Sequence, residues 1–190
     1  MDVEEIFSSA RSIYISECLQ ALDELVSAEL VALEQAKFTE ESGEILTQGE
    51  LELPIRDDCV LVNDATTQVL SFSINQGQFS FDPVHVNWTN NIQVSIYPFE
   101  WNQCVLFFHR GPQQVEWDFL RQWYFKWFDE GIMDDHGFLG CIHSMSDPEL
   151  VDDGYKVIID FGSAPIEAIE DWIETVGLMG YERVRIGYTN

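Results

Sequence analysis

The sequence predicts an α+β fold, and three observations along its 190 residues indicate it. An apolar repeat at helical spacing fills residues 1–40, short alternating runs separated by turn formers occupy 44–100, and helical and strand patterns alternate over 101–190. With 46% hydrophobic and 13% aromatic residues, the chain has enough apolar material for a buried core. Its length favours a single domain made of these three parts.

The first part predicts one long N-terminal helix. Asp2 followed by Glu5 has the form of a capping box, in which the side chain of each residue accepts a hydrogen bond from the backbone N–H of the other. If the helix runs unbroken to Phe38, it is roughly 50 Å long at ~1.5 Å per residue, so we expect one break or docking on something outside its own core. The apolar stripe on one face consists of Ile15, Leu19, Leu22, Val26, Leu30 and Leu33.

The second part predicts an antiparallel β-meander with one solvated face. Apolar and polar residues alternate in short runs, most clearly at 69–74 and 92–97. The runs are separated by residues that favour turns, such as those at 75–77 and 90–91.

The third part predicts a β-α-β-β-α-β unit. Its expected elements are a strand at 104–108, a helix at 113–129, strands at 138–143 and 155–161, a helix at 165–178 and a strand at 183–188. This order is the split βαβ pattern of ferredoxin-like folds. Many unrelated activities occur on that arrangement, so it predicts architecture and not function.

The charge is strongly negative and unevenly distributed. The chain has 34 acids and 9 bases, a formal net charge of −25. Residues 1–64 carry 16 acids and 3 bases, residues 65–112 carry 2 and 1, and residues 113–190 carry 16 and 5. We therefore expect acidic patches, which repel nucleic-acid backbones and anionic lipids, so direct nucleic-acid or membrane binding is excluded. No apolar run reaches the ~20 residues of a membrane span, and the acidic N-terminus is unlike a signal peptide, which predicts a cytoplasmic protein.

Catalytic and metal motifs are weak. Cys18, Cys59, Cys104 and Cys141 are spread without any CxxC pair, which predicts free thiols. Cys141 and His143 alternate onto one face of a predicted strand, so a thiol and an imidazole lie near each other. Since nothing in the sequence supplies the orienting group and oxyanion site that a nucleophilic enzyme needs, catalysis by this pair is the least favoured function. We expect no cofactor.

Two acidic segments, 134–136 and 147–154, suggest metal binding at first sight. Their spacing does not match an EF-hand calcium loop. His136, His143 and Asp134 make a poor zinc site without supporting residues around them. We therefore expect a solvated acidic loop and assign no metal ligand.

The helix at 113–129 is unusually aromatic. Its apolar residues cover about half of the circumference, whereas packing on one sheet face needs a stripe of only about 100°. Either another element of the chain covers the apolar surface that the sheet does not, or this extra aromatic surface binds a partner with Trp117 as an anchor.

A net charge of −25 destabilises a small folded body by self-repulsion. High cellular salt, solubility alone or a strongly basic partner could each account for it. In size, charge and lack of a catalytic signature, the chain resembles immunity proteins that neutralise nuclease toxins and inhibitors that mimic DNA. The resemblance implies a non-catalytic inhibitor of a basic partner, such as a nuclease or another nucleic-acid-binding protein.

The residues expected to contact this partner are acids of the first helix and of the 134–153 region, with one aromatic anchor: Glu17, Glu24, Glu34, Asp134, Asp135, Asp147, Glu149, Asp152, Asp153 and Trp117. The alternative function is a structural adaptor that oligomerises, for example as a homodimer, through its N-terminal helix.

Overall fold

Three helices and three sheets make up the part of the chain that the computed structural model describes. It describes residues 1–190 except 26–29, 40–41, 58–59, 64–67, 72–78, 90–91, 110, 113–115, 130, 132–137, 153 and 189–190, and leaves aside the side chains of 22–25, 30–33, 60–63 and 68–71. The helices are α1 (Val3–Leu25), α2 (Asp118–Asp129) and α3 (Glu167–Leu178). The α+β class predicted from the sequence is confirmed. None of the described helices is both long and apolar enough to cross a membrane.

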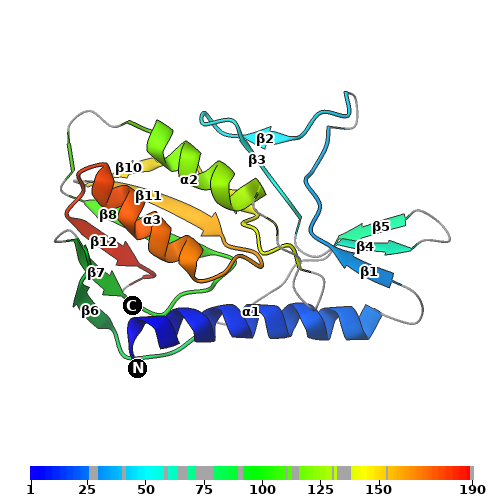
Figure 1. Cartoon of the computed structure of the whole chain (residues 1–190), viewed down its shortest axis with the longest axis horizontal. Coiled ribbons are helices and arrows are strands. Elements are labelled where there is room, and N and C mark those ends of the chain that lie inside the picture. The colour runs from blue at the N-terminus through cyan, green and yellow to red at the C-terminus, as the bar shows by residue number, and fades with distance from the viewer. Residues whose placement is uncertain are drawn as a thin grey trace.

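The largest sheet has the strand order β10-β11-β8-β12-β7-β6, with the short strand β9 beside β11. Its strands are β6 (Val84–Asn87), β7 (Gln93–Ile96), β8 (Cys104–His109), β9 (Ser144–Met145), β10 (Glu149–Val151), β11 (Gly154–Asp160) and β12 (Arg183–Ile186). The sheet is mixed because β7 runs parallel to β12, whereas the other pairs are antiparallel. Figure 1 shows α2 and α3 on one face of this sheet and α1 along one side of the molecule.

Helix α1 begins as predicted but ends early. The backbone N–H of Asp2 donates to Glu5 Oε2 at 2.9 Å and that of Glu5 donates to Asp2 Oδ1 at 2.8 Å, so the capping box is confirmed. The helix ends at Leu25, and β1 (Leu30–Leu33) is a strand. The expectation of a helix to about residue 40 is therefore wrong. Short apolar runs suit either structure, and here antiparallel pairing with β4 (Val60–Asn63) selects the strand.

Of the predicted stripe of α1, Ile15 and Leu19 are partly buried against the core, and the side chains of Leu22, Val26, Leu30 and Leu33 lie outside the described part of the chain. A fully buried stripe begins closer to the N-terminus. It consists of Ile6, Phe7, Ala10, Tyr14 and Cys18, all fully buried. These residues belong to the same core cluster as the buried residues of the main sheet, α2 and α3. The first helix therefore uses its apolar face inside its own chain.

The strands between residues 44 and 100 do not form one meander. β2 (Thr47–Gln48) and β3 (Leu53–Pro54) pair as a hairpin, β4 and β5 (Gln68–Ser71) join β1 in a three-stranded sheet, and β6 and β7 extend the main sheet. The meander prediction is wrong because β4 pairs with β1 and β7 pairs with β12, and both of these partners lie outside residues 44–100.

The order of elements after residue 101 follows the prediction except for its second strand. Residues 138–143 are not a strand, and the short strands β9 and β10 pair with β11 instead. In this stretch Ile142 N–H donates to Trp127 O at 3.1 Å and His143 N–H donates to Asp160 O at 2.9 Å. Gly140 has a φ of 68°, which breaks an extended course. The prediction of a strand at 138–143 is therefore wrong.

Both flanks of the aromatic helix α2 are in contact with other elements. Trp123 Nε1 donates to the carbonyl oxygen of Ala168 on α3 at 3.0 Å, and the Tyr124 hydroxyl donates to the carbonyl oxygen of Pro54 on β3. Trp117 is partly buried, with its ring edge-on to that of Tyr155 at 4.9 Å between centroids. Packing within the chain thus accounts for most of the surplus aromatic surface.

Candidate functional site

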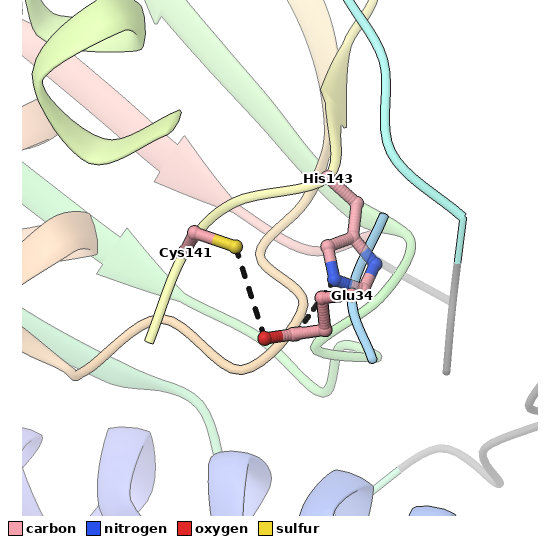
Figure 2. A group of neighbouring side chains, drawn as sticks. All are labelled: Glu34, Cys141 and His143. Carbon is pink, nitrogen blue, oxygen red and sulfur yellow. Dashed lines mark hydrogen bonds and ion pairs between the residues drawn. The ribbon is translucent and has the colours of Figure 1, made fainter. Parts of the chain in front are cut away.

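A buried carboxylate joins three distant parts of the chain. Glu34 follows β1 and is only 3% exposed. Figure 2 shows its carboxylate pointing between Cys141 and His143, which lie in the irregular stretch before β9. Ser163, in the loop that leads to α3, is also fully buried beside it. We refer to Glu34, Cys141, His143 and Ser163 as the Glu34 cluster.

The Glu34 carboxylate accepts hydrogen bonds on both oxygens. Oε1 lies 2.8 Å from His143 Nε2 and accepts from Ser163 N–H at 3.2 Å. Oε2 accepts from Leu139 N–H at 2.6 Å and from the Ser163 hydroxyl at 2.7 Å, and Cys141 Sγ lies 3.8 Å away. A carboxylate offers only acceptors, so His143 Nε2 carries the hydrogen in this contact.

These contacts set the protonation of the cluster. Burial by itself raises the pKa of the Glu34 carboxyl, but the hydrogen bond and charge of His143 and the hydrogen bonds from Ser163 and Leu139 outweigh it and leave the pKa below its ordinary value. Burial, followed by the nearby Glu34 charge, raises the pKa of the Cys141 thiol to about 12. At neutral pH the protein therefore holds a carboxylate beside a protonated thiol.

Cys141 and His143 come together as predicted, but as partners of one carboxylate. His143 Nε2 faces Glu34, and the thiol has lost nucleophilic character because the thiolate is the reactive form. A cysteine nucleophile needs a thiol whose pKa is lowered by its neighbours, whereas the pKa of the Cys141 thiol is raised. A carboxylate oxygen, a thiol and an imidazole are, however, three side-chain types that bind metal ions.

Glu34 is buried, so its expected position on a solvated face is wrong, and its role in partner binding stays a prediction that the burial does not favour. The reason is the early end of α1, since a continuous helix would have placed Glu34 on a solvated face. The Arg56 guanidinium also binds the backbone here, donating to the carbonyl oxygen of Glu34 at 3.0 Å and to that of Phe128 at 3.1 Å.

Two predicted acids of the second acidic region already have partners within the chain. The Asp147 carboxylate accepts from Glu50 N–H at 2.6 Å and from Leu51 N–H at 3.1 Å, which fixes the turn between β2 and β3. Glu149 on β10 forms an ion pair with Lys156 on β11. Both carboxylates therefore contribute less free negative charge than the sequence suggests.

The other predicted contacts are scattered or not described. Glu17 is exposed on α1 and Asp152 is exposed at a φ of 46° beside β10, while Trp117 packs against the core. The side chain of Glu24 and the residues Asp134, Asp135 and Asp153 lie outside the described part of the chain, as does Cys59. As predicted, Cys18, Cys104 and Cys141 are not joined in disulfides.

Four other carboxylates, from two helices, do share one region. Glu167, Glu170 and Glu174 are three and four positions apart on α3, so they lie on one face of that helix. Glu4, on the first turn of α1, interacts electrostatically with Glu170. We call Glu4, Glu167, Glu170 and Glu174 the acidic helix surface.

Contacts elsewhere place the two helices together. The Arg11 side chain of α1 donates to the carbonyl oxygens of Ser163 and Ala164, just before α3, at 2.8 Å in each case. The sequence shows the spacing of the acids on α3, but the approach of Glu4 depends on tertiary packing and could not be predicted from it.

The four carboxylates of the acidic helix surface repel one another. Partial burial, followed by the charges of Glu167, Glu4 and Glu174, raises the pKa of the Glu170 carboxyl above its usual 4.5. Within the described residues, none of the four forms an ion pair with a base. Within the part of the chain that the structure describes, their mutual repulsion is therefore not relieved by an ion pair.

This repulsion predicts a stabilising substitution. Because the pKa of Glu170 is higher in the folded than in the unfolded protein, protonated Glu170 favours folding below pH 4.5. This contribution to the free energy of unfolding is lost as the pH rises through the folded-state pKa. Glu170→Gln should therefore raise the free energy of unfolding at pH 7 by about 0.2–1 kcal/mol, the scale of a few like-charge neighbours, and have little effect at pH 3. Urea unfolding at both pH values measures this, with exposed Glu116→Gln as the control. The prediction is contradicted if the gain in unfolding free energy over wild type is smaller at pH 7 than at pH 3.

In comparisons with protein-family models, with curated proteins and with solved structures, the chain has no match. The Glu34 cluster and the acidic helix surface are thus the two features from which a function can be argued.

Proposed function

We propose that the protein is a non-catalytic inhibitor that binds a basic partner protein through its acidic helix surface. The observation that carries this proposal is the crowding of Glu4, Glu167, Glu170 and Glu174, with which no base of the described residues forms an ion pair. A Lys- or Arg-rich partner would replace their repulsion with attraction. Retaining a repulsive surface at a cost in stability is typical of a site kept for function.

The chemistry of the partner follows from the charge. A chain with net charge −25 attracts cationic proteins over long range and steers their association, which raises on-rates by about 10–10³. Proteins that bind nucleic acids present the matching cationic surface, since duplex DNA carries one charge per ~1.7 Å. A nuclease or another nucleic-acid-binding protein is therefore the proposed partner, encountered in the cytoplasm.

The Glu34 cluster supports the non-catalytic part of the proposal. Its thiol is protonated at neutral pH and its imidazole faces a carboxylate instead of the thiol. The buried stripe of α1, from Ile6 to Cys18, weighs against the adaptor function, because it already packs in the chain's own core.

We also propose that the C-terminal unit is ferredoxin-like. In support, β8 lies between β11 and β12 and is antiparallel to both, and α3 connects these two strands. The outer side of β11 carries β9 and β10, where the fold requires its remaining strand.

An inhibition assay tests the proposed function. Purified protein is added to a panel of basic nucleases, and the rate of DNA cleavage is measured in 50 mM and 300 mM salt. We expect inhibition of at least one nuclease at low salt, weakened by tenfold or more at high salt because exposed charges are screened. Neutral and acidic nucleases serve as controls. The absence of both binding and inhibition across the basic panel would contradict the proposal.

A further inference from the structure

We propose that Glu34, Cys141 and His143 bind one zinc ion. One carboxylate oxygen, the thiol sulfur and one imidazole nitrogen all lie within 4.8 Å of one another, and all three residues are buried. Zinc in proteins takes these three ligand types. The inference is independent of the basic partner, since it concerns a buried cluster and not the acidic helix surface.

The residues around the cluster orient these ligands as a metal site requires. His143 presents Nε2 to the cluster, while its other ring nitrogen, Nδ1, lies 3.7 Å from Asp160 Oδ2. Histidines that bind metals commonly hydrogen-bond the second nitrogen to a carboxylate, and here the Asp160 carboxylate lies beside Nδ1 at ion-pair distance, longer than a hydrogen bond. The Asp160 carboxylate is itself held by Gly162 N–H at 2.9 Å.

The Glu34 carboxylate is fixed in a similar manner. Leu139 N–H and Ser163 N–H each hold one of its oxygens, and neither hydrogen bond involves the thiol or the imidazole. Both can remain when a metal replaces the contacts to Cys141 and His143. The Ser163 hydroxyl donates to Glu34 Oε2 at 2.7 Å and accepts from Gly140 N–H at 2.8 Å and Cys141 N–H at 3.3 Å, so it holds the carboxylate in place and is not itself a ligand.

The exchange of protons for zinc leaves the charge of the cluster unchanged. Zn²⁺ forms bonds to Cys141 Sγ, His143 Nε2 and a Glu34 oxygen. The S–H bond of Cys141 breaks, and the His143 imidazolium loses its Nε2 proton and keeps Nδ1–H, so that a neutral imidazole binds the metal; both protons go to solvent. One dication therefore replaces two protons, so no additional net charge is buried. Coordination also stabilises the thiolate, which the metal-free site disfavours.

Zinc also accounts for a thiol at this position. Without a metal, Cys141 contributes only a weak S–H contact to Glu34 at 3.8 Å, to a carboxylate that other groups already satisfy. Zinc–ligand bonds of about 2.0–2.3 Å require ligand atoms somewhat farther apart than the 2.8 Å between Glu34 and His143. The irregular stretch 138–143 is the segment that would adjust.

Titration with cobalt(II), a spectroscopic substitute for zinc, tests the site in the full chain after treatment with a chelator. We expect one equivalent of Co²⁺ to give a thiolate-to-metal absorption band, and one equivalent of Zn²⁺ to remove it. Cys141→Ser should lose the band and bind zinc at least 100-fold more weakly. Cys104→Ser, which alters another buried free thiol on β8, should keep both properties. Asp160→Asn should weaken binding by about 10–100-fold.

A second measurement keeps the proposal testable if a variant fails to fold. One equivalent of Zn²⁺ should raise the melting temperature of the wild-type chain, because a ligand that binds only the folded state stabilises it. No shift, a cobalt spectrum without a thiolate band, or full affinity in folded Cys141→Ser would each overturn the proposal. Because no basic protein is present, failure here leaves the proposed inhibitor function untouched, and failure of nuclease inhibition leaves the zinc site untouched.

Discussion

Replacement of Glu34 by alanine is expected to lower the free energy of unfolding by about 3–5 kcal/mol, the cost of removing one partner from a buried charged network. Glu34 is 3% exposed, and its carboxylate is the shared acceptor for His143, Ser163 and the backbone of Leu139. Alanine would leave these donors buried without their acceptor, and each buried unsatisfied group costs about 1–3 kcal/mol. Chemical denaturation monitored by tryptophan fluorescence measures the loss.

Glu17→Ala is the matched control for this experiment. It removes the same side chain from an exposed position on α1, and exposed substitutions usually change stability by no more than about 0.5 kcal/mol. Equal losses in the two variants would show that Glu34 is not the acceptor of a buried network.

Phe108→Ala is expected to cost a similar amount, about 3–5 kcal/mol, by opening a cavity in the core. Phe108 lies on the central strand β8, and its fully buried ring contacts three aromatic side chains. Its centroid lies 5.7 Å from that of Tyr155, 5.8 Å from that of Trp172 and 4.7 Å from that of Tyr181. Thermal and urea unfolding should both shift.

The control for Phe108 is Phe119, an aromatic residue of α2 that is 37% exposed. Phe119→Ala removes the same ring from a position where less apolar surface returns to water, so its loss of stability should be clearly smaller. If Phe119→Ala proved as destabilising as Phe108→Ala, the placement of β8 at the centre of the core would be contradicted.

Local signals in the sequence predicted local structure well. The Asp2–Glu5 capping box and the helices near 113–129 and 165–178 follow from contacts between residues close in sequence, and the structure has them. The end of α1 was not predictable in this way. The apolar spacing continues through Leu33, and only the pairing of β1 with β4 decides against a helix there.

The two functional features could be predicted only in part. The alternation of Cys141 and His143 indicated that they are neighbours, but Glu34 joins them across more than a hundred residues, which no local pattern reports. The spacing of Glu167, Glu170 and Glu174 was visible in the sequence, whereas the addition of Glu4 required the packing of α1 beside α3. Net charge predicted that a negative region exists but not where it lies.

The two features have opposite expected effects on the stability of the fold. The Glu34 cluster joins the end of β1 to the segments around α3 and is expected to stabilise the fold. The acidic helix surface is expected to weaken it, because its like charges repel one another. A substitution that raises stability while lowering partner binding is therefore the signature we expect at the second feature and not at the first.

The most direct test of the central claim compares two variants of equal net charge. One carries Glu→Gln at the acidic helix surface, at Glu4, Glu167, Glu170 and Glu174. The other carries Glu→Gln at four exposed positions elsewhere, at Glu44, Glu50, Glu116 and Glu182. Affinity for a basic nuclease that the wild type binds is measured for both at the same salt concentration. We predict that the first variant loses at least tenfold more affinity than the second, whereas equal losses would show that total charge, and not this surface, binds the partner.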